Sequence, residues 1–428
     1  VPMEDGVALA QRTSLWRHRD FLLFWTGQSA SMLGSSVSYL ALPLVGVLFL
    51  HVNAFGMGLL ATVERLPPLL VGPFVGPLVD RLPRRSLMIV ADAGRAALLS
   101  WIPIGAWLGV LALWHLLVIG FGVGALTMLF TVAYQAFLPN VIQPEQLNDG
   151  NGKLTASQSV AEVGGPGVAG WLMAAGGPPT AIIADAASYV ISASCLVRMR
   201  ARDVTNRATR QVRDSMMRVL GDGFRLLWRD PVLRTVTVST ATMAFFAQLQ
   251  EAVYFLFLVR SLHFSAGLIG VLFSLSAIAG FGAAILCDRL AKRVGLGPLI
   301  VTTQLLMAVG CLLLALATGP TAIAAAVILA GEASIAAGLS LSAVGFTTLR
   351  QVRTADEVRG RVIGASRFLT QACVPVAALL GGALGGLFGL RVALLVGGVG
   401  TLLGAALVLR RDVVRVSTSL ADERAPAG

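Results

Sequence analysis

The sequence predicts an all-α membrane protein whose twelve transmembrane helices form two pseudo-symmetric bundles of six helices each. Three observations carry this prediction. Of the 428 residues, 56% are hydrophobic and only 13% are charged, whereas a soluble domain carries roughly 25% charged residues. Apolar stretches about 20 residues long recur along the chain, and a charged motif of the first half returns in the second half. A water-soluble domain is therefore excluded. A disordered chain is excluded by the abundant Leu, Val, Ile and Phe, and a long coiled coil by the 47 Gly and 18 Pro residues.

Twelve apolar stretches are each close to the length that crosses a hydrocarbon core of about 30 Å. In the first half they cover residues 22–50, 56–79, 87–109, 111–136, 155–175 and 178–198. In the second half they cover residues 235–259, 264–287, 298–318, 320–347, 363–388 and 391–409. The chain thus divides into an N-terminal segment (1–20), a first six-helix bundle (21–198), a basic linker (199–234), a second six-helix bundle (235–409) and a C-terminal tail (410–428).

The positive charge is distributed asymmetrically. Of the 33 Lys and Arg residues, 28 lie in the terminal segments and in alternate connections between the stretches. Because basic residues in short loops remain on the cytoplasmic side, both termini and the linker are predicted to be cytoplasmic. The ratio of 31 Arg to 2 Lys is typical of a GC-rich bacterial genome. We therefore expect a multi-pass protein of a bacterial cytoplasmic membrane, and the net charge of +11 reflects topology rather than binding to nucleic acid.

The linker carries apolar residues at helical spacing, namely Met216, Leu220, Phe224 and Leu227, with Arg and Asp on the other faces. This pattern predicts an amphipathic helix on the inner membrane surface, where apolar side chains enter the headgroup region. A simple tether between the bundles is the other interpretation, and the two are compatible.

An internal repeat supports the division into two halves. The motif residues Asp80, Arg81, Arg84 and Arg85 follow the second stretch, and Asp288, Arg289, Lys292 and Arg293 follow the eighth stretch, each 208 residues later. Pro166 in the fifth stretch and Pro375 in the eleventh are 209 residues apart. The register therefore persists across each half, which predicts two similar six-helix bundles.

The pattern Gly76-x-x-x-Asp80-Arg81-x-x-Arg84-Arg85 resembles the signature loop of the major facilitator superfamily. Other elements resemble its drug and siderophore exporter branch, which includes macrolide efflux proteins. They are Trp25-Thr26-Gly27-Gln28, Leu66-Pro67-Pro68, Gly72-Pro73, Gly165-Pro166, Asp185-Ala186-Ala187-Ser188-Tyr189 and Gly360-Arg361-Val362. The resemblance implies two parallel six-helix halves with the substrate site at the midplane between them. It also implies that the signature loop, with its degenerate copy at Asp288 and Arg289, latches the halves together on the cytoplasmic side.

Small residues suit positions where helices approach closely. Gly76 would let the second span approach a neighbouring helix. In the fifth span, Gly165, Pro166 and Gly170 resemble the antiporter motif Gly-x-x-x-Gly-Pro-x-x-Gly-Gly, two of whose glycines are Ala here, and the proline predicts a bend. Related proton antiporters carry an Arg in the fourth span where this chain has Gly120. Proton coupling in this chain must therefore use other groups.

Ionisable residues within the spans are the candidates for coupling, because each is costly in hydrocarbon unless it is paired or faces a cavity. Glu64 and Glu332 lie closest to mid-span and belong to opposite halves, so they are the first candidates for the proton-coupling acid. Glu251, in the outer half of the seventh span, is the third. Arg65 and Arg367 are the predicted basic partners in the substrate cavity.

The remaining intramembrane acids are expected to be mainly structural. Asp92 and Arg95 stand at i and i+3 close to the cytoplasmic end of the third span, and this spacing predicts an ion pair that supports the signature loop. Asp185, three residues before Ser188, is interpreted as architectural. Glu162, beside the proline of the fifth span, is compatible with either role.

The sequence gives no indication of an enzyme. All four His residues fall outside the span interiors, so the pattern predicts neither a metal site nor a nucleophile and base at membrane depth, and no phosphate-binding loop is present. We expect no cofactor. The predicted function is a monomeric secondary active transporter that exports a hydrophobic or amphipathic small molecule, such as a drug, a macrolide-like compound or a siderophore. It would work by alternating access and proton antiport, with the substrate, protons and the lipid bilayer as its partners. The alternatives are an uptake symporter or facilitator for a small metabolite, and a membrane scaffold that transports nothing.

Overall fold

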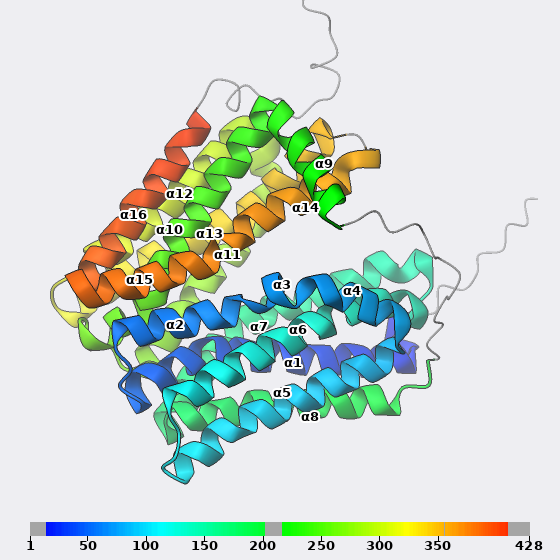
Figure 1. The fold of residues 1–428 in the computed structure, drawn as a ribbon, viewed down its shortest axis with the longest axis horizontal. Coiled ribbons are helices and arrows are strands. Elements are labelled where there is room, and N and C mark those ends of the chain that lie inside the picture. The colour runs from blue at the N-terminus through cyan, green and yellow to red at the C-terminus, as the bar shows by residue number, and fades with distance from the viewer. Residues whose placement is uncertain (1–13, 202–215, 355, 410–428) are drawn as a thin grey trace, which may run out of the picture.

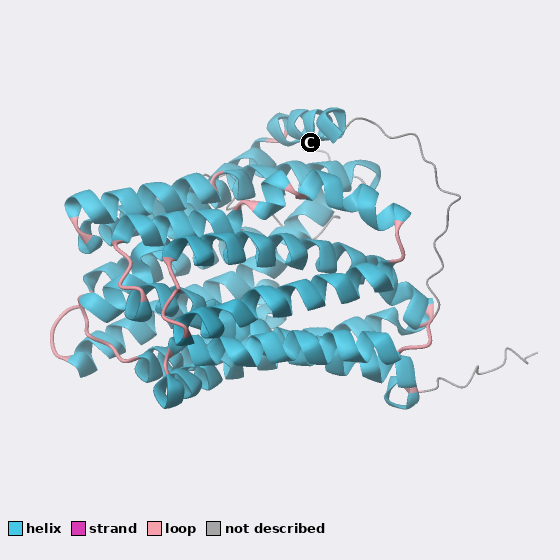
Figure 2. Cartoon of the chain, turned by 60° about the horizontal axis from the view of Figure 1, so that its bottom comes forward, coloured by secondary structure: helices cyan, strands magenta, loops and turns pink. Residues whose placement is uncertain are grey.

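The protein is described by a computed structural model that covers residues 14–201, 216–354 and 356–409. Within these ranges the chain consists of helices joined by short loops (Figure 2). The predicted N-terminal segment and linker are described only in part, and the predicted tail (410–428) lies outside the described residues.

The first bundle contains the six predicted spans of the N-terminal half. It begins with a short 3-10 helix, η1 (Leu15–Arg17). The first long helix, α1 (Arg19–Leu44), is extended by a π-helical turn, η2 (Val45–Phe49). The other long helices are α5 (Arg84–Trp107), α6 (Leu113–Val141), α7 (Leu147–Gly176) and α8 (Pro178–Arg198). The 3-10 helix η3 (Pro144–Gln146) leads into α7. The second span consists of three pieces, α2 (Ala54–Arg65), α3 (Pro67–Leu70) and α4 (Gly72–Arg81).

The second span is not the continuous helix predicted over residues 56–79. Its two parts, Ala54–Leu70 and Gly72–Arg81, meet at an angle of 50°. Pro67, Pro68 and Pro73 surround the break, and each proline removes a backbone N–H and clashes with the preceding turn. The bend directs α4 away from the axis of α2.

The second bundle repeats this arrangement. Its helices are α10 (Pro231–Arg260), α11 (Ala266–Val294), α12 (Leu296–Leu316), α13 (Thr321–Arg353), α14 (Asp356–Ala372), α15 (Val374–Phe388) and α16 (Leu390–Ala406), followed by a 3-10 turn η4 (Leu407–Leu409). Helices α14 and α15 form the eleventh span, which a turn at Cys373 interrupts just before Pro375.

The described helices agree with the predicted all-α membrane fold. Ten of them are long and apolar enough to cross a membrane, and the bent α2–α4 segment makes an eleventh span. Helix α7 has 30 residues and packs between α1 and α11. We count it as the twelfth span by position, because its polar side chains, such as Gln158 and Glu162, line a cavity rather than face lipid.

The turns at one end of the molecule show the repeat most clearly. In the first bundle these turns contain a residue with positive φ, namely His51 (52°), Gly109 (70°) and Gly177 (85°). In the second bundle the corresponding residues are His263 (56°), Gly319 (92°) and Gly389 (93°). The members of each pair are 210 or 212 residues apart, close to the spacing of the charged motif. We call the end with these six turns the hairpin end, and the opposite end, where α8 leaves and α9 (Met216–Arg229) begins, the linker end.

The two bundles meet at the hairpin end and diverge towards the linker end (Figure 1). Between them, α2 packs against α15 and α7 packs against α11. A side-chain methyl group at Gly170 would lie 3.1 Å from Cα of Gly270, and one at Gly58 would lie 2.6 Å from Cα of Gly382. Glycine therefore permits both close contacts between the bundles.

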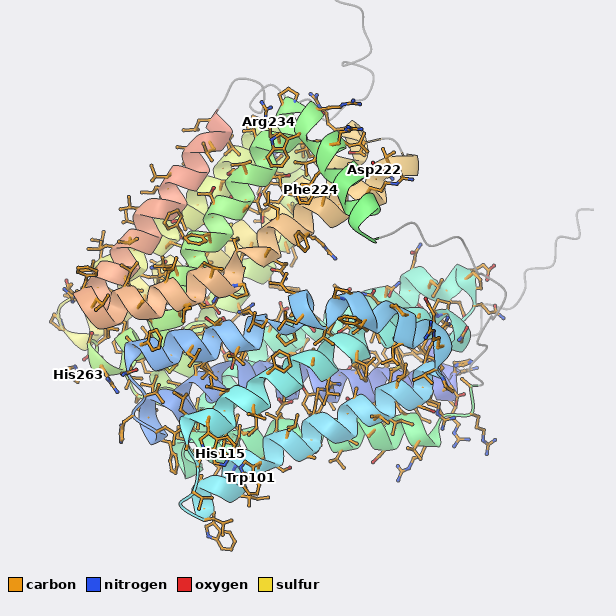
Figure 3. All side chains as sticks on the ribbon, in the orientation of Figure 1. Trp101, His115, Asp222, Phe224, Arg234 and His263 are labelled. Atoms are coloured by element: carbon orange, nitrogen blue, oxygen red, sulfur yellow. The ribbon has the colours of Figure 1, made fainter. Side chains whose placement is uncertain are left out.

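Helix α9 corresponds to the amphipathic helix predicted in the linker. Its residue Leu227 packs on protein, whereas the side chains of Met216 and Leu220 lie outside the described part. Leu227 is fully buried in a cluster with Val362 and Leu349, and Asp222 lies 3.7 Å from Arg361 of α14. Figure 3 shows Asp222 and Phe224 on α9, beside the linker end of the second bundle. The prediction that the apolar side chains of this helix enter the lipid headgroup region is therefore wrong for Leu227, which packs on the linker end of the second bundle.

Candidate functional site

A cavity of about 1040 Å³ lies between the two bundles. It is lined by α1, α5, α6 and α7 of the first bundle and by α10, α11, α12, α13, α14, α15 and α16 of the second, with Arg65 at the end of α2. The surface of the lining is mostly apolar, although more than half of the lining residues carry a polar or charged side chain. These groups include Gln28, Tyr39, Arg65, Arg95, Gln158, Glu162, Gln248, Glu251, Gln304 and Glu332. A concave, mostly apolar site with a few polar groups is the usual form of a small-molecule site.

The hairpin end closes this cavity. In addition to the glycine contacts, Arg260 of α10 donates hydrogen bonds to the carbonyl oxygens of His51 and Val52 in the first bundle, at 3.0 and 3.1 Å. These bonds join the two bundles at the base of the cavity, whereas the bundles diverge at the linker end (Figure 1).

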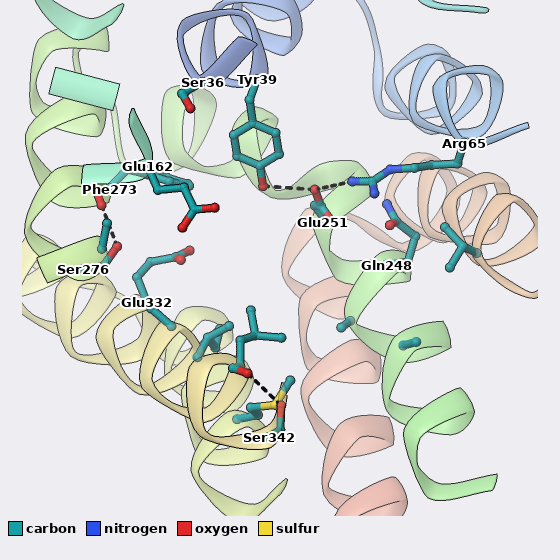
Figure 4. Close-up of a pocket in the computed structure, with 18 of the residues that line it drawn as sticks. Ser36, Tyr39, Arg65, Glu162, Gln248, Glu251, Phe273, Ser276, Glu332 and Ser342 are labelled. Carbon is teal, nitrogen blue, oxygen red and sulfur yellow. Dashed lines mark hydrogen bonds and ion pairs between the residues drawn. The ribbon is translucent and has the colours of Figure 1, made fainter. Parts of the chain in front are cut away.

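Three side chains from three helices meet inside the cavity (Figure 4). Arg65 Nη2 donates to Glu251 Oε1 at 3.2 Å, and the Tyr39 hydroxyl donates to the same oxygen at 3.2 Å. Arg65 belongs to the first bundle and Glu251 to the second. The ion pair therefore bridges the bundles, and both side chains are partly exposed, at 44% for Arg65 and 34% for Glu251. We call Tyr39, Arg65 and Glu251 the bridge.

Two further carboxylates face the cavity from opposite bundles. Glu162 of α7 and Glu332 of α13 point towards each other in Figure 4. Gln158 donates a hydrogen bond of 2.8 Å to Glu162 Oε1. The structure thus brings two of the three predicted coupling acids, Glu251 and Glu332, into one cavity together with Glu162.

The third predicted acid lies in an adjoining space. Glu64 lines a smaller cavity of about 210 Å³, which shares Tyr39, Arg65 and Glu251 with the main cavity. Its Oε1 atom is buried and has no hydrogen-bond partner. The Glu64 side chain lies over Gly120 of α6, where a methyl group would be 3.0 Å from Glu64 Cγ. Gly120 therefore provides the space that this acid occupies.

Asp92 and Arg95 form a buried ion pair, with side chains that are 0% and 4% exposed. Its depth corrects the expectation that it lies close to the end of the span, because α5 begins at Arg84 and Asp92 is about two helical turns further in. The Arg95 guanidinium lies 4.6 Å from the centre of the Phe130 ring and 4.1 Å from that of Tyr189. Arg95 lines the main cavity, whereas Asp92 does not.

The signature loop lies at the linker end, and the contacts of its arginines hold the first bundle together. Arg84 donates to the carbonyl oxygen of Ala136 at the end of α6, and Arg85 donates to that of Leu196 at the end of α8, at 2.9 and 2.8 Å. Asp80 and Arg81 are exposed.

The close helix contact expected at Gly76 is absent, since a methyl group there would meet no atom within 4 Å. In the degenerate copy, Asp288 lies in α11 but its side chain is outside the described part, and Arg289 is exposed.

The predicted bend motif forms the contacts of α7. A methyl group at Gly165 would lie 2.3 Å from Ser36 Cβ of α1, and Gly170 packs on Gly270 of α11. Pro166 lies within one continuous helix. Arg367, predicted as a basic partner, is exposed on α14 and does not line the cavity.

Asp185 is buried on α8, where Ser188 donates to its Oδ1 at 3.2 Å. Tyr39 is a residue of the bridge that sequence reasoning missed. One signal was available, because it is one of only four tyrosines and lies among Ser35, Ser36 and Ser38 in an apolar span.

The described residues contain no cluster of three or more His, Cys, Asp or Glu that could hold a metal ion. Three of the histidines, His51, His115 and His263, lie near the hairpin end. His115 stacks on Trp114, with 3.6 Å between the ring centres, and His263 occupies a turn (Figure 3).

Comparison with known families gives a match over most of the chain. Residues 24–378 match the sequence model described as Major Facilitator Superfamily. An MFS-type transporter of Sinorhizobium fredii, y4rN, is 27% identical, with 76% of this chain and 78% of that protein covered. The multidrug efflux pump Tap of Mycobacterium tuberculosis is 26% identical, with 87% and 88% covered. Macrolide efflux protein A of Streptococcus pyogenes is 30% identical, with 36% and 37% covered.

Solved structures share the fold. A point mutant of the nucleoside transporter NupG superposes with a TM-score of 0.76 at 11% identity, covering 91% of this chain and 99% of that one. A bacterial homologue of the iron transporter ferroportin in an inward-facing state gives a TM-score of 0.71 at 18% identity, with 92% and 98% covered. A bacterial ferroportin homologue in an outward-facing state gives a TM-score of 0.54 at 18% identity, with 91% and 98% covered.

Proposed function

Because this chain belongs to the major facilitator superfamily, and is a multi-pass secondary transporter rather than an enzyme, we propose that it exports a hydrophobic or amphipathic small molecule in exchange for protons. The observation that carries this proposal is the cavity between the bundles. It is closed at the hairpin end, has a mostly apolar lining and contains three carboxylates, one of which pairs with an arginine that bridges the bundles.

The export direction is supported by relatives rather than by geometry. Tap is named as a multidrug efflux pump, and the relative from Streptococcus pyogenes is named as a macrolide efflux protein. A volume of about 1040 Å³ is at the upper end of the range for small-molecule sites and suits a bulky substrate. The apolar lining favours a substrate that partitions into lipid, and the carboxylates provide a few fixed polar contacts.

The orientation that we propose puts the linker end in the cytoplasm. The excess of basic residues in the terminal segments and in the connections at this end supports it. In this orientation the structure is open to the cytoplasm and closed to the outside. The higher TM-score with the inward-facing ferroportin homologue than with the outward-facing one supports the same conformation.

Alternating access then requires the hairpin end to open and the linker end to close. The signature loop residues Asp80, Arg81, Arg84 and Arg85 would latch the linker end in that second state. Their positions at the ends of α4 and α5 support this role, because the linker ends of the two bundles face each other there.

Proton coupling would use a carboxylate that is desolvated in one state and reachable from each side in turn. Glu64, Glu332 and Glu251 remain the candidates. Glu64 is the most enclosed of the three at its carboxylate oxygen, and Glu332 and Glu251 line the main cavity.

The experiment is transport by the purified full chain in proteoliposomes that carry the linker end outside. With an acidic lumen, a radiolabelled macrolide and the fluorescent amphipathic cation ethidium are offered as probes. We expect accumulation in the lumen that collapses when a protonophore is added. An uptake symporter or a scaffold would accumulate neither probe beyond the level in protein-free liposomes under the same gradient, which measure the passive trapping of a weakly basic macrolide in an acidic lumen.

A further inference from the structure

We propose that Arg65 is a positioning residue that switches between two carboxylates, Glu251 of the opposite bundle and Glu64 of its own helix. With Glu64 protonated, Arg65 pairs with Glu251 and holds the hairpin end closed. With Glu64 ionised, Arg65 turns to Glu64, the bridge breaks and the hairpin end is released. The proposal rests on the proposed proton-driven export and assigns its coupling step to one cation and two acids.

The first observation is that the bridge separates two compartments. Tyr39, Arg65 and Glu251 line both the main cavity and the smaller cavity that holds Glu64. The smaller cavity is also lined by residues of α1 and α2 towards the hairpin end, such as Leu42, Pro43 and Met57, and by residues of α6 and α10. Glu64 therefore lies on the closed side of the bridge, and the substrate cavity lies on the open side.

The second observation is the imbalance of partners at the bridge. Glu251 Oε1 accepts hydrogen bonds from both Arg65 and Tyr39, whereas the buried Oε1 of Glu64 accepts none. A buried carboxylate oxygen without a hydrogen-bond donor disfavours the ionised form of the acid. The surroundings of Glu64 Oε1 therefore favour the neutral, protonated form of Glu64 while the arginine is paired with Glu251.

No other charge among the described residues competes for this role. Besides Arg65 of its own helix, the titratable groups lining the Glu64 cavity are Glu251 from α10 and Tyr39 from α1. Helix α6 contributes Gly120, Val123 and Gly124, and α15, which packs against α2, contributes no residue to the lining. When Glu64 loses its proton, Arg65 is therefore the cation available to it.

The switch would also couple protonation of Glu64 to the movement of the two bundles at the hairpin end. Arg65 and Glu251 belong to different bundles, so the 3.2 Å ion pair can persist only while the bundles meet near the hairpin end. Arg65 and Glu64 are neighbours on α2 and move together. A proton that enters from the outside onto Glu64 would free Arg65 to rejoin Glu251 and close the hairpin end. Loss of that proton to the cytoplasmic side would weaken the closure and permit substrate to be released outside.

The test measures the opening of the hairpin end directly, without substrate. Spin labels are placed at Leu108 and Thr321, which are exposed at the hairpin ends of the two bundles, in the full chain with its four cysteines replaced. Distances are recorded in lipid nanodiscs from acidic to alkaline pH. In the parent protein we expect a short distance at acidic pH and a growing long-distance population as the pH rises.

The variants separate a switch from a simple structural link. Glu64→Gln, which mimics the protonated acid, should keep the short distance at every pH. Arg65→Gln and Glu251→Gln should give the long-distance population at every pH, while Arg65→Lys should retain the pH response. Glu145→Gln, exposed at the linker end and outside both cavities, is the matched control and should respond as the parent does.

An exchange of the two charges, Arg65→Glu with Glu251→Arg, rebuilds the bridge but leaves Glu64 beside another acid. We expect a short distance with no response to pH. This variant and Glu64→Gln carry the test if Arg65→Gln does not fold. A pH response that persists in Arg65→Gln, in Glu64→Gln or in the charge exchange would overturn the proposal.

Failure of the proposed Arg65 switch can be distinguished from failure of the proposed function. Transport that does not depend on the proton gradient would refute proton-driven export, whether or not the distances between the spin labels respond to pH. Proton-driven transport by a protein whose distances respond to pH without Glu64 or Arg65 would refute only the switch.

Discussion

Gly58 of α2 and Gly382 of α15 face each other across the two bundles, and a methyl group on Gly382 would lie 2.7 Å from Cα of Gly58 and 2.8 Å from the carbonyl oxygen of Ala54. Both neighbours are backbone atoms, which cannot move aside as a flexible side chain does. The hairpin end can therefore close as it does here only because neither residue has a side chain.

Gly382→Ala should prevent this closure and favour conformations that are open at the hairpin end. We expect increased reaction of a single cysteine at Ala61, which lines the Glu64 cavity, with an impermeant thiol reagent added from the hairpin side. Gly386→Ala, one turn away on α15, is the matched control because a methyl group there meets no atom within 4 Å. Equal labelling in the two variants would show that the glycine contact does not control closure.

Asp80→Asn should reduce transport strongly while leaving the stability of the protein unchanged or slightly raised. Asp80 is exposed in the last turn of α4, where a carboxylate opposes the helix dipole by about 0.3–1 kcal/mol. Its charge therefore gives α4 no stabilisation in this state, and its proposed contact forms when the linker end closes. The measurement is the initial rate of efflux beside the thermal unfolding midpoint. Asp288→Asn in the degenerate copy should slow efflux less, and equal rates in both variants would argue against a latch at Asp80.

Asp92→Asn should destabilise the first bundle. The change leaves the guanidinium of Arg95, which is 4% exposed, without its carboxylate partner, and breaking a buried pair costs about 3–5 kcal/mol. Asp149→Asn removes the partner of Lys153 in a pair whose carboxylate is 58% exposed, and it should cost about 0–1 kcal/mol. Unfolding of the two variants in a denaturing detergent titration compares these losses, and similar losses would contradict the structural role of Asp92.

The orientation can be tested with single cysteines in cells. Glu145, exposed between α6 and α7, lies at the linker end, and Thr180, exposed at the start of α8, lies at the hairpin end. We expect an impermeant reagent added to intact cells to label a cysteine at Thr180 and to spare one at Glu145. Labelling of the cysteine at Glu145 but not of the one at Thr180 would show that the orientation in the membrane is opposite to the proposed one.

Features that depend on local pattern could be predicted from the sequence. Span length and hydropathy predict the membrane helices, and the motif at Asp80 and Asp288 indicates the two-fold repeat. The break near Pro67 escapes such a prediction, since prolines are tolerated in membrane helices and hydropathy does not report a bend. The helix predicted in the linker exists, but periodicity cannot tell whether its apolar face meets lipid or protein, and for Leu227 it meets protein.

The contacts of the candidate site could be predicted less well from the sequence, for a physical reason. Spacing along one helix reveals partners three or four residues apart, such as Asp92 and Arg95. Arg65 and Glu251 are 186 residues apart and meet only because the two bundles come together. The acids within the spans could be identified from the sequence. That Glu64 and Glu332 line two different cavities, with the bridge between them, could be learned only from the packed structure.

The central claim, that a proton on Glu64 drives export, is tested most directly by Glu64→Gln in proteoliposomes. Glutamine cannot release a proton, so the hairpin end should stay closed and the pH-gradient-driven accumulation of a transported probe should be lost. Binding of the same probe to the purified protein, which needs no opening of the hairpin end, should survive. Glu332→Gln and Glu251→Gln, measured in parallel, show whether this separation is specific to Glu64. Gradient-driven accumulation by Glu64→Gln at the rate of the parent protein, with the same dependence on pH, would contradict the account.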